Sequence, residues 1–201
     1  MKFSILDVET TGFSPQNGDR VVEIGVIRMD ENGHITTAFD SLINPESEEV
    51  GPTHVHGITS AMVQNAPLFK DVTGPLLDAL DGTIVVAHNA SFDMGFLRTE
   101  FSRAHITLPK FRPLCTLILA RRYLSHLSSK SLESCRSHLG LSNAGAHNAL
   151  ADARATAQVL QYFLENHPEI EFPEAFQSPG QKKVEGEMLF DFAGPILKPR
   201  G

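Results

Sequence analysis

The sequence has little of several features that mark specialised classes of protein. Its 201 residues include only two cysteines, Cys115 and Cys135, which form neither a disulfide framework nor a zinc-binding spacing. The first residues, MKFSILDVE, reach a charge at Asp7 before the core of a signal peptide could form, and no apolar run approaches the roughly 18 residues of a membrane span. We therefore expect a soluble protein of the reducing cytoplasm with no membrane partner.

Positive charge is also scarce. The chain has 17 lysines and arginines against 24 aspartates and glutamates, which gives a formal net charge of −7. A protein that coats nucleic acid through a broad basic surface needs many positive side chains, so the composition excludes that class. It does not exclude an enzyme that meets a polyanion through metal ions.

The pattern of apolar residues predicts one α/β domain. Residues 3–9, 21–29 and 33–45 are strand-like and joined by short turn-rich segments, which predicts an antiparallel meander. A buried strand over 83–89 then alternates with helices, so we expect a mixed sheet, with three antiparallel strands followed by parallel strands, flanked by helices. The helices are expected at 67–82, with Gly74-Pro75 as a candidate for the true start, and at 90–106, 116–124, 131–141 and 148–167.

The composition of the sequence changes near Pro168. Prolines and glycines become frequent from this point, as in linkers and tails. The sequence therefore divides into a domain at residues 1–167 and a tail or linker at residues 168–201.

Two acidic residues stand at the end of the first strand. Residues two apart on a strand share a face and lie roughly 6.5 Å apart, so Asp7 and Glu9 point the same way. At an effective dielectric constant of about 20 their repulsion is roughly 2.5 kcal/mol. A divalent cation between them would reverse the sign of this energy. The alternative is a strand that emerges into solvent here, with both carboxylates hydrated.

Two more carboxylates occupy similar junctions. Asp93 falls in the first turn of the helix after the buried strand, and Asp152 falls in the first turns of the final helix. Each could be an ordinary partner of a helix dipole. Open α/β sheets bind ligands at strand ends, however, and four carboxylates suit Mg²⁺ or Mn²⁺. His147 lies five residues before Asp152. Its side chain would lie close to such a site, unless its role is structural.

The segments that carry these residues resemble the motifs of a known family. DVETTG, HNASFD and HNALADA resemble, in order, the three motifs of the DEDDh exonucleases, which are DnaQ-like, proofreading-type enzymes with a ribonuclease H-like fold. The motifs supply the catalytic set Asp7, Glu9, Asp93, His147 and Asp152. A sister subclass has tyrosine four residues before the last aspartate, where this chain has Asn148, so the histidine subclass fits. The resemblance covers roughly residues 2–165.

The resemblance implies hydrolysis of nucleic acid from its 3′ end. The four carboxylates would hold two Mg²⁺ ions, for which Mn²⁺ could substitute, and His147 would accept the proton of the attacking water. The product would be a nucleoside 5′-monophosphate, released stepwise from single-stranded DNA or a frayed 3′ end. The expected substrate contacts are Thr10, His56, Asn89 and Phe92. Phe92 also fits a purely structural place in the core.

Several functional alternatives stay open at this point. DVETTG and HGIT favour a proofreading or repair exonuclease for DNA, whereas an enzyme that trims RNA 3′ ends would carry the same motifs. A nucleic-acid-binding or replication adaptor is a third reading, because the apolar cluster at residues 188–192 could dock on a DNA polymerase or sliding clamp, or fold back as a flap. The stretch from Arg98 to Arg136 contains eight basic residues. They would guide the nucleic-acid strand toward the site, or else lie on solvated helix faces.

Overall fold

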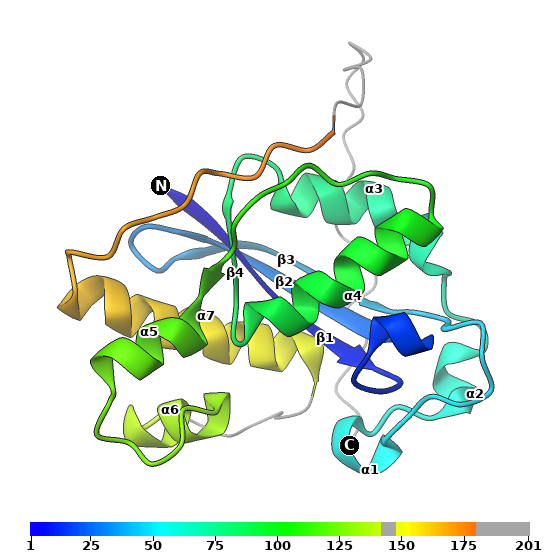
Figure 1. Ribbon diagram of the computed structural model, residues 1–201, viewed down its shortest axis with the longest axis horizontal. Coiled ribbons are helices and arrows are strands. Elements are labelled where there is room, and N and C mark those ends of the chain that lie inside the picture. Colours follow the sequence, from blue (N-terminus) through cyan, green and yellow to red (C-terminus); the bar gives the residue numbers. More distant parts are fainter. Residues whose placement is uncertain (142–147, 180–201) are drawn as a thin grey trace.

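The computed structural model describes residues 1–141 and 148–179, in which helices cover both faces of one sheet (Figure 1). The strands are β1 (Lys2–Thr10), β2 (Val21–Asp30), β3 (Ile35–Leu42), β4 (Ile84–Ala87) and β5 (Leu114–Cys115). The helices are α1 (Thr53–His56), α2 (Ser60–Val63), α3 (Phe69–Leu80), α4 (Ala90–Arg103), α5 (Thr116–Tyr123), α6 (Leu132–His138) and α7 (Ala149–Asn166). A short 3₁₀ helix, Pro15–Asn17, follows β1.

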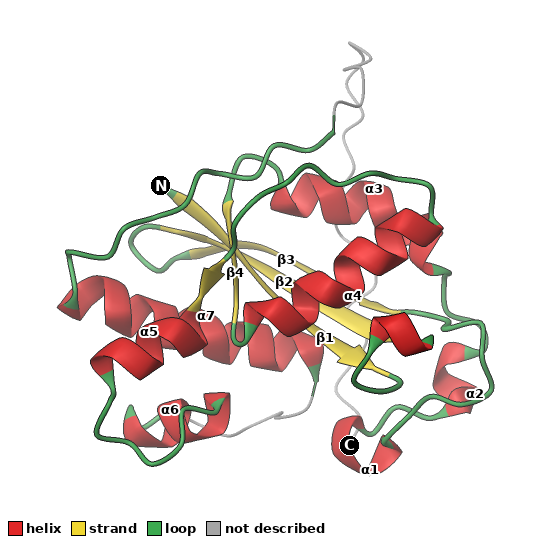
Figure 2. Ribbon diagram, viewed as in Figure 1, coloured by secondary structure: helices red, strands yellow, loops and turns green. Residues whose placement is uncertain are grey.

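The strand order, β3-β2-β1-β4-β5, confirms the mixed sheet expected from the sequence (Figure 2). β1, β2 and β3 pair in antiparallel fashion, and β4 and β5 extend the sheet in parallel to β1. Parallel pairing requires a long crossover connection, which α1 to α3 provide between β3 and β4. The carboxyl ends of β1, β4 and β5 therefore meet at one edge of the sheet.

The central strand β1 contributes to two apolar cores. Leu6 and Val8 point to the face covered by α3 and α4, whereas Phe3 and Ile5 point to the face covered by α5 and α7. All four side chains are buried, and each such burial stabilises the fold by roughly 1.5–3 kcal/mol. Because side chains alternate along a strand, Asp7 and Glu9 continue the Phe3 and Ile5 row and point to the α7 face.

The structure decides the start of α3, which the sequence left open, and adds the strand β5. α3 begins at Phe69, ahead of Gly74-Pro75, because the Asp71 carboxylate accepts a 3.0 Å hydrogen bond from the Leu68 amide and closes the first turn. Pro75 lies inside α3 on its exposed side. β5 was not predicted, because two residues are too few to show alternation. No helix of the described ranges combines the length and apolarity that a membrane span needs.

The first part of the segment predicted as a tail lies against the domain. The Phe176 amide donates to the Thr83 carbonyl at 2.7 Å, and the Phe176 carbonyl accepts from the Gly82 amide at 2.9 Å. The Phe176 ring is 1% exposed and meets Phe111 edge-on, with centroids 4.8 Å apart. We propose that the domain boundary lies after this strap, residues 168–179. The apolar cluster at 188–192 lies outside the described residues.

Candidate active site

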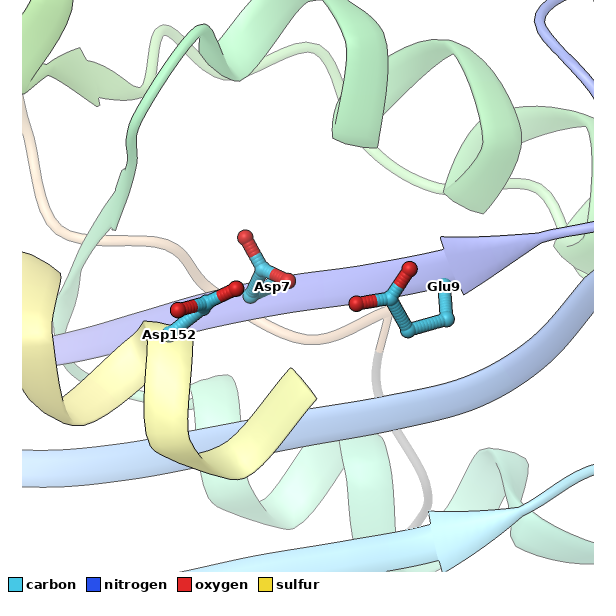
Figure 3. A group of neighbouring side chains, drawn as sticks. All are labelled: Asp7, Glu9 and Asp152. Atoms are coloured by element: carbon cyan, nitrogen blue, oxygen red, sulfur yellow. The ribbon is translucent and has the colours of Figure 1, made fainter. Parts of the chain in front are cut away.

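Three carboxylates meet at the carboxyl end of β1 (Figure 3). Asp7 and Glu9 extend from one face of the strand, and Asp152 reaches them from the first turn of α7. One oxygen of each carboxylate lies within 4.8 Å of one oxygen of each of the others. All three residues are half-buried. The fold therefore brings together groups that are far apart in the sequence.

Asp93 lies deeper, beside this group. It occupies the first turn of α4, as expected, and its side chain is 3% exposed. The backbone amide of Val8, between Asp7 and Glu9 on β1, lies close enough to the Asp93 carboxylate to favour its charged form and so opposes the rise in its pKa. This contact ties the start of α4 to the strand that carries the other acids.

The electrostatics of the four carboxylates favour a bound cation. Burial, followed by the charges of Asp93 and Asp152, raises the pKa of Asp7 well above its ordinary value. Burial is also the largest cause that raises the pKa of Glu9 and the pKa of Asp93, each to about 7. Anionic oxygens held this close repel one another unless a positive charge lies among them. Because these donors are all hard oxygens, the set fits Mg²⁺ or Mn²⁺.

The first turn of α7 is fixed to β2 by a residue that sequence reasoning missed. Glu23 is 5% exposed and pairs with Glu9 across the β1–β2 ladder. Its carboxylate accepts hydrogen bonds from the Asn148 side-chain amide at 2.7 Å and from the Ala149 backbone amide at 3.0 Å. Asn148 in turn caps the helix by accepting from the Ala151 amide at 3.1 Å. The available signal was a lone acid inside the apolar run VVEIGVIRM.

Gly25 allows α7 to approach the same strand closely. A Cβ atom at this position would lie 2.4 Å from the Leu150 amide nitrogen and 2.5 Å from the Ala149 carbonyl carbon. Gly25 also pairs with Asp7 in the ladder. A glycine inside a strand pattern often marks such a close backbone approach.

Arg136 contributes positive charge beside the carboxylates. It extends from α6, is 4% exposed, and its Nη1 atom lies 3.5 Å from Oδ1 of Asp152. A solvated helix face is therefore the wrong interpretation for this member of the basic stretch. The ion pair restrains the Asp152 side chain.

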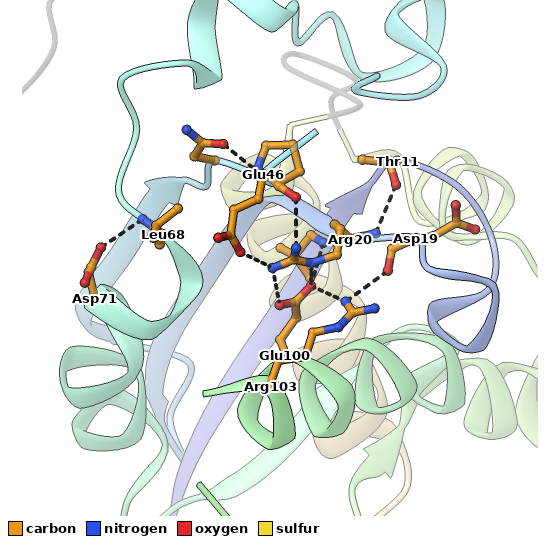
Figure 4. Close-up of polar contacts among 11 residues, drawn as sticks. Thr11, Asp19, Arg20, Glu46, Leu68, Asp71, Glu100 and Arg103 are labelled. Carbon is orange, nitrogen blue, oxygen red and sulfur yellow. Dashed lines mark hydrogen bonds and ion pairs between the residues drawn. The ribbon is translucent and has the colours of Figure 1, made fainter. Parts of the chain in front are cut away.

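The loop after β1 is held in place by an ion-pair network (Figure 4). Arg20 donates to the buried Glu100 carboxylate at 2.7 Å from Nε and at 3.0 Å from Nη2, and it also donates to the Pro45 carbonyl at 2.9 Å. The Arg20 amide donates to the Thr11 hydroxyl at 2.9 Å. These contacts connect the β1–β2 loop to α4 and to the segment after β3.

The expected substrate-contacting residues occupy different environments. Thr10 ends β1 and its hydroxyl donates to the Gly12 carbonyl at 2.7 Å. His56 is buried, and its Nδ1 accepts from the Ile58 amide at 3.0 Å. Asn89 is exposed at the start of α4 with a left-handed backbone, φ 69°. Phe92 is half-buried, with its ring centroid 5.0 Å from that of Phe96, so its packing role is real. The expected general base, His147, lies outside the described residues.

An exposed aromatic side chain was missed. Phe13 lies in the loop after β1 and is 87% exposed, although an aromatic ring normally gains by burial. Its sequence context, TTGFSPQ, directly follows the first motif, and that adjacency was the available signal. An exposed aromatic face in the loop that follows the first motif is suited to stacking on a nucleobase.

Comparison with known proteins identifies the family. A family model described as Exonuclease matches residues 4–160. The chain belongs to this exonuclease family. The match confirms the resemblance to DEDDh exonucleases, a group that depends on divalent metal ions, in agreement with the oxygen donor set of Asp7, Glu9 and Asp152.

Curated relatives of this exonuclease include domains of larger proteins. The chain is 34% identical over 173 residues to the 3′-5′ exonuclease DinG of Bacillus subtilis, covering 86% of this chain and 18% of that protein. It is 38% identical over 165 residues to the PolC-type DNA polymerase III of Thermotoga maritima, covering 81% and 12%. It is 36% identical over 162 residues to the DNA polymerase III subunit epsilon of Rickettsia prowazekii, covering 77% and 70%. The chain thus spans a small part of the first two relatives.

Solved structures share the fold. Exonuclease X in complex with 5′ overhanging duplex DNA is 28% identical, with a TM-score of 0.66 over 83% of this chain and 93% of that one. The nuclease domain of 3′hExo bound to rAMP has a TM-score of 0.74 over 87% of this chain and 97% of that one, at 19% identity. The second likeness supports the ribonuclease H-like fold alone.

Proposed function

We propose that this exonuclease removes nucleoside 5′-monophosphates from DNA 3′ ends. The observation that carries the proposal is the group of Asp7, Glu9 and Asp152, whose oxygens lie within 4.8 Å of one another beside Asp93. Acids with strongly raised pKa values cluster at functional sites, because folding alone gains nothing from their repulsion.

The four carboxylates are proposed to hold two Mg²⁺ ions, with Mn²⁺ as a substitute. When bound, such ions polarise the scissile phosphate and favour a deprotonated water at neutral pH. The chain supplies the positioning: Glu23 holds the start of α7, and Arg136 restrains the carboxylate of Asp152. Since Glu9 and Asp93 have pKa values of about 7 without metal, a cation must displace protons when it binds, and the apparent metal affinity should rise with pH.

Proton transfer and substrate contact are assigned to residues around this group. His147 directly precedes Asn148, the N-cap of α7, and we propose it as the general base that takes the proton of the attacking water, a task that suits histidine as a residue type. The terminal nucleotide is proposed to meet the following residues: Thr10, Phe13, His56, Asn89 and Phe92.

DNA is favoured over RNA as the substrate by the relatives. Subunit epsilon and PolC-type enzymes are named as parts of DNA polymerase III, and the 28%-identical Exonuclease X was solved with duplex DNA. We therefore propose a proofreading or repair role in the cytoplasm, with a DNA polymerase as the partner. An RNA-trimming enzyme and a binding adaptor are outcomes that the following experiment distinguishes.

The test uses 5′-labelled single-stranded DNA and RNA of one sequence, incubated with Mg²⁺, Mn²⁺ or EDTA. We expect stepwise shortening from the 3′ end, only with metal, and faster on DNA. Faster digestion of RNA would favour the trimming enzyme, and no digestion by the folded protein would favour the adaptor.

Two variants test the assigned roles. Asp7→Ala should abolish turnover, because it removes the carboxylate that adjoins the other three acids. His147→Ala should lower turnover by roughly 10²–10⁴-fold, the usual contribution of a general base. It should leave metal-dependent binding of a 3′ end unchanged. Near-normal turnover in either variant contradicts its assignment, and circular dichroism controls for folding.

A further inference from the structure

An open depression lies near the candidate active site and is lined by residues from the start of α4, from α5 and from the start of α6. Figure 2 shows the arrangement of these helices. Its volume is about 520 Å³. Its walls include His88, Asn89, Leu117, Arg121, Lys130 and Leu132. The lining combines two cations with apolar surface and contains no carboxylate, although the whole chain is acidic. This composition suits a polyanion that also carries apolar groups.

The two cations present N–H donors to the depression. Arg121 lies in the last turn of α5 and is exposed, and within the described residues it forms no ion pair. The Lys130 ammonium donates to the carbonyl oxygens of Ser125 and Leu127, which fixes its position and uses two of its three donors. A phosphate that enters the depression would therefore contact the guanidinium of Arg121, which can adjust its position, and the ammonium of Lys130, whose position is fixed.

The wall between these cations and the sheet is pre-organised by His88. Its Nε2 atom lies 2.9 Å from the Lys130 carbonyl oxygen, and its Nδ1 atom lies 2.9 Å from the Thr116 hydroxyl. The carbonyl can only accept, so Nε2 donates, and Nδ1 shares the second hydrogen bond with the Thr116 hydroxyl, which also lies 3.4 Å from the Ala87 carbonyl oxygen. The ring thus connects the end of β4, the start of α5 and the loop before α6.

Two helices link the depression to the carboxylates. Asn89 precedes Asp93 by about one turn of α4, and Leu132 precedes Arg136 by about one turn of α6. One turn advances a helix by about 5.4 Å. Since Arg136 pairs with Asp152, both walls of the depression lead directly to the group of acids.

We infer that this depression binds the backbone of the nucleic-acid strand on the 5′ side of the scissile phosphate, with Arg121 and Lys130 contacting a phosphate. The inference rests on the proposed function. Contacts of this kind are independent of base sequence, and the apolar surface of Leu117 and Leu132 would accept a sugar or base face. Although the protein carries a net negative charge, it would thereby bind a nucleic-acid strand through two local positive charges.

The test compares a long and a minimal substrate. Arg121→Gln removes an exposed charge, and Arg112→Gln is the matched control, because Arg112 is exposed, precedes β5 and does not line the depression. The long substrate is an oligothymidylate of about ten nucleotides. The minimal substrate is the p-nitrophenyl ester of thymidine 5′-monophosphate, which has no nucleotide on the 5′ side. Both are assayed over a range of salt concentrations.

We expect Arg121→Gln to raise KM for the oligonucleotide about ten-fold, in line with the loss of a charge-assisted hydrogen bond to phosphate. The slope of log(kcat/KM) against log salt should become shallower by about 0.7, the value for one phosphate contact on a single strand. Hydrolysis of the minimal ester should not change, and Arg112→Gln should behave like the wild type.

Other outcomes overturn the inference. An unchanged KM for the oligonucleotide, or an equal rise for both substrates, would show that Arg121 does not act on the 5′ side. If the wild type hydrolyses neither substrate, the proposed function is contradicted. In that case the affinity for a fluorescent oligonucleotide is measured by anisotropy. Equal affinities of Arg121→Gln and Arg112→Gln would then overturn the inference about the depression.

Discussion

Gly25→Ala should separate Asp152 from its partner carboxylates. The new Cβ atom would lie 2.4 Å from the Leu150 amide nitrogen, where ordinary contact begins at 3.4 Å, so the start of α7 must retreat by about 1 Å (3.4 − 2.4). Asp152 follows two residues later on the same helix and moves with it. Magnesium ligands lie at about 2.0–2.1 Å and tolerate only about 0.2 Å of error, so this displacement removes one donor from the group.

The expected result is a loss of cation affinity together with a loss of stability of similar free energy. Changes that misplace a ligand typically weaken metal binding roughly 10–100-fold, and overpacking typically costs about 1–3 kcal/mol. Mn²⁺ affinity is measured by electron paramagnetic resonance without substrate, and stability by urea unfolding in EDTA. The control is Gly95→Ala in α4, whose Cβ would meet only Pro15, at 3.9 Å.

The reasoning is refuted if Gly25→Ala binds Mn²⁺ within about two-fold of the wild type while Asp152→Ala does not. That result would mean that the close approach of α7 to β2 does not set the position of Asp152. A loss of affinity in Gly95→Ala as well would point to a general disturbance near the site.

Two further predictions concern stability. Burial raises the pKa of Glu9 and of Glu23 from 4.5 to about 7, so between these values the folded state holds more protons than the unfolded state, and without metal the free energy of unfolding should fall as pH rises. The fall is at most about 3.4 kcal/mol per carboxyl, and solvent screening reduces it. Mn²⁺ should therefore stabilise the chain more at about pH 8 than at about pH 5, and urea unfolding that shows the reverse contradicts this. Phe176→Ala should cost roughly 3–5 kcal/mol because the buried ring leaves a cavity, whereas the exposed neighbour variant Gln177→Ala should cost little; equal melting temperatures would show that the strap does not stabilise the domain.

Much of the fold followed from local patterns. The meander, the buried strand β4 and the helices α4, α5, α6 and α7 were predicted because each carries a period or a cap that its own residues define. β5 was missed because two residues define no period, and the start of α3 was uncertain because only the contact of Asp71 with the Leu68 amide decides it.

The sequence by itself determined the chemistry of this protein. The two-residue period of a strand places Asp7 and Glu9 on one face, and the three motifs identify the family. Tertiary structure alone decided how the site is held. In the sequence Glu23 is one acid in an apolar run. Only the packing of α7 on β2 brings the Asn148 side chain and the Ala149 amide to its carboxylate, which then holds the start of the helix. The sequence of the strap near Phe176 is typical of a linker. In the structure its backbone hydrogen-bonds to Gly82 and Thr83, and the Phe176 ring is buried. Such contacts depend on which distant segments meet, and no local pattern records that.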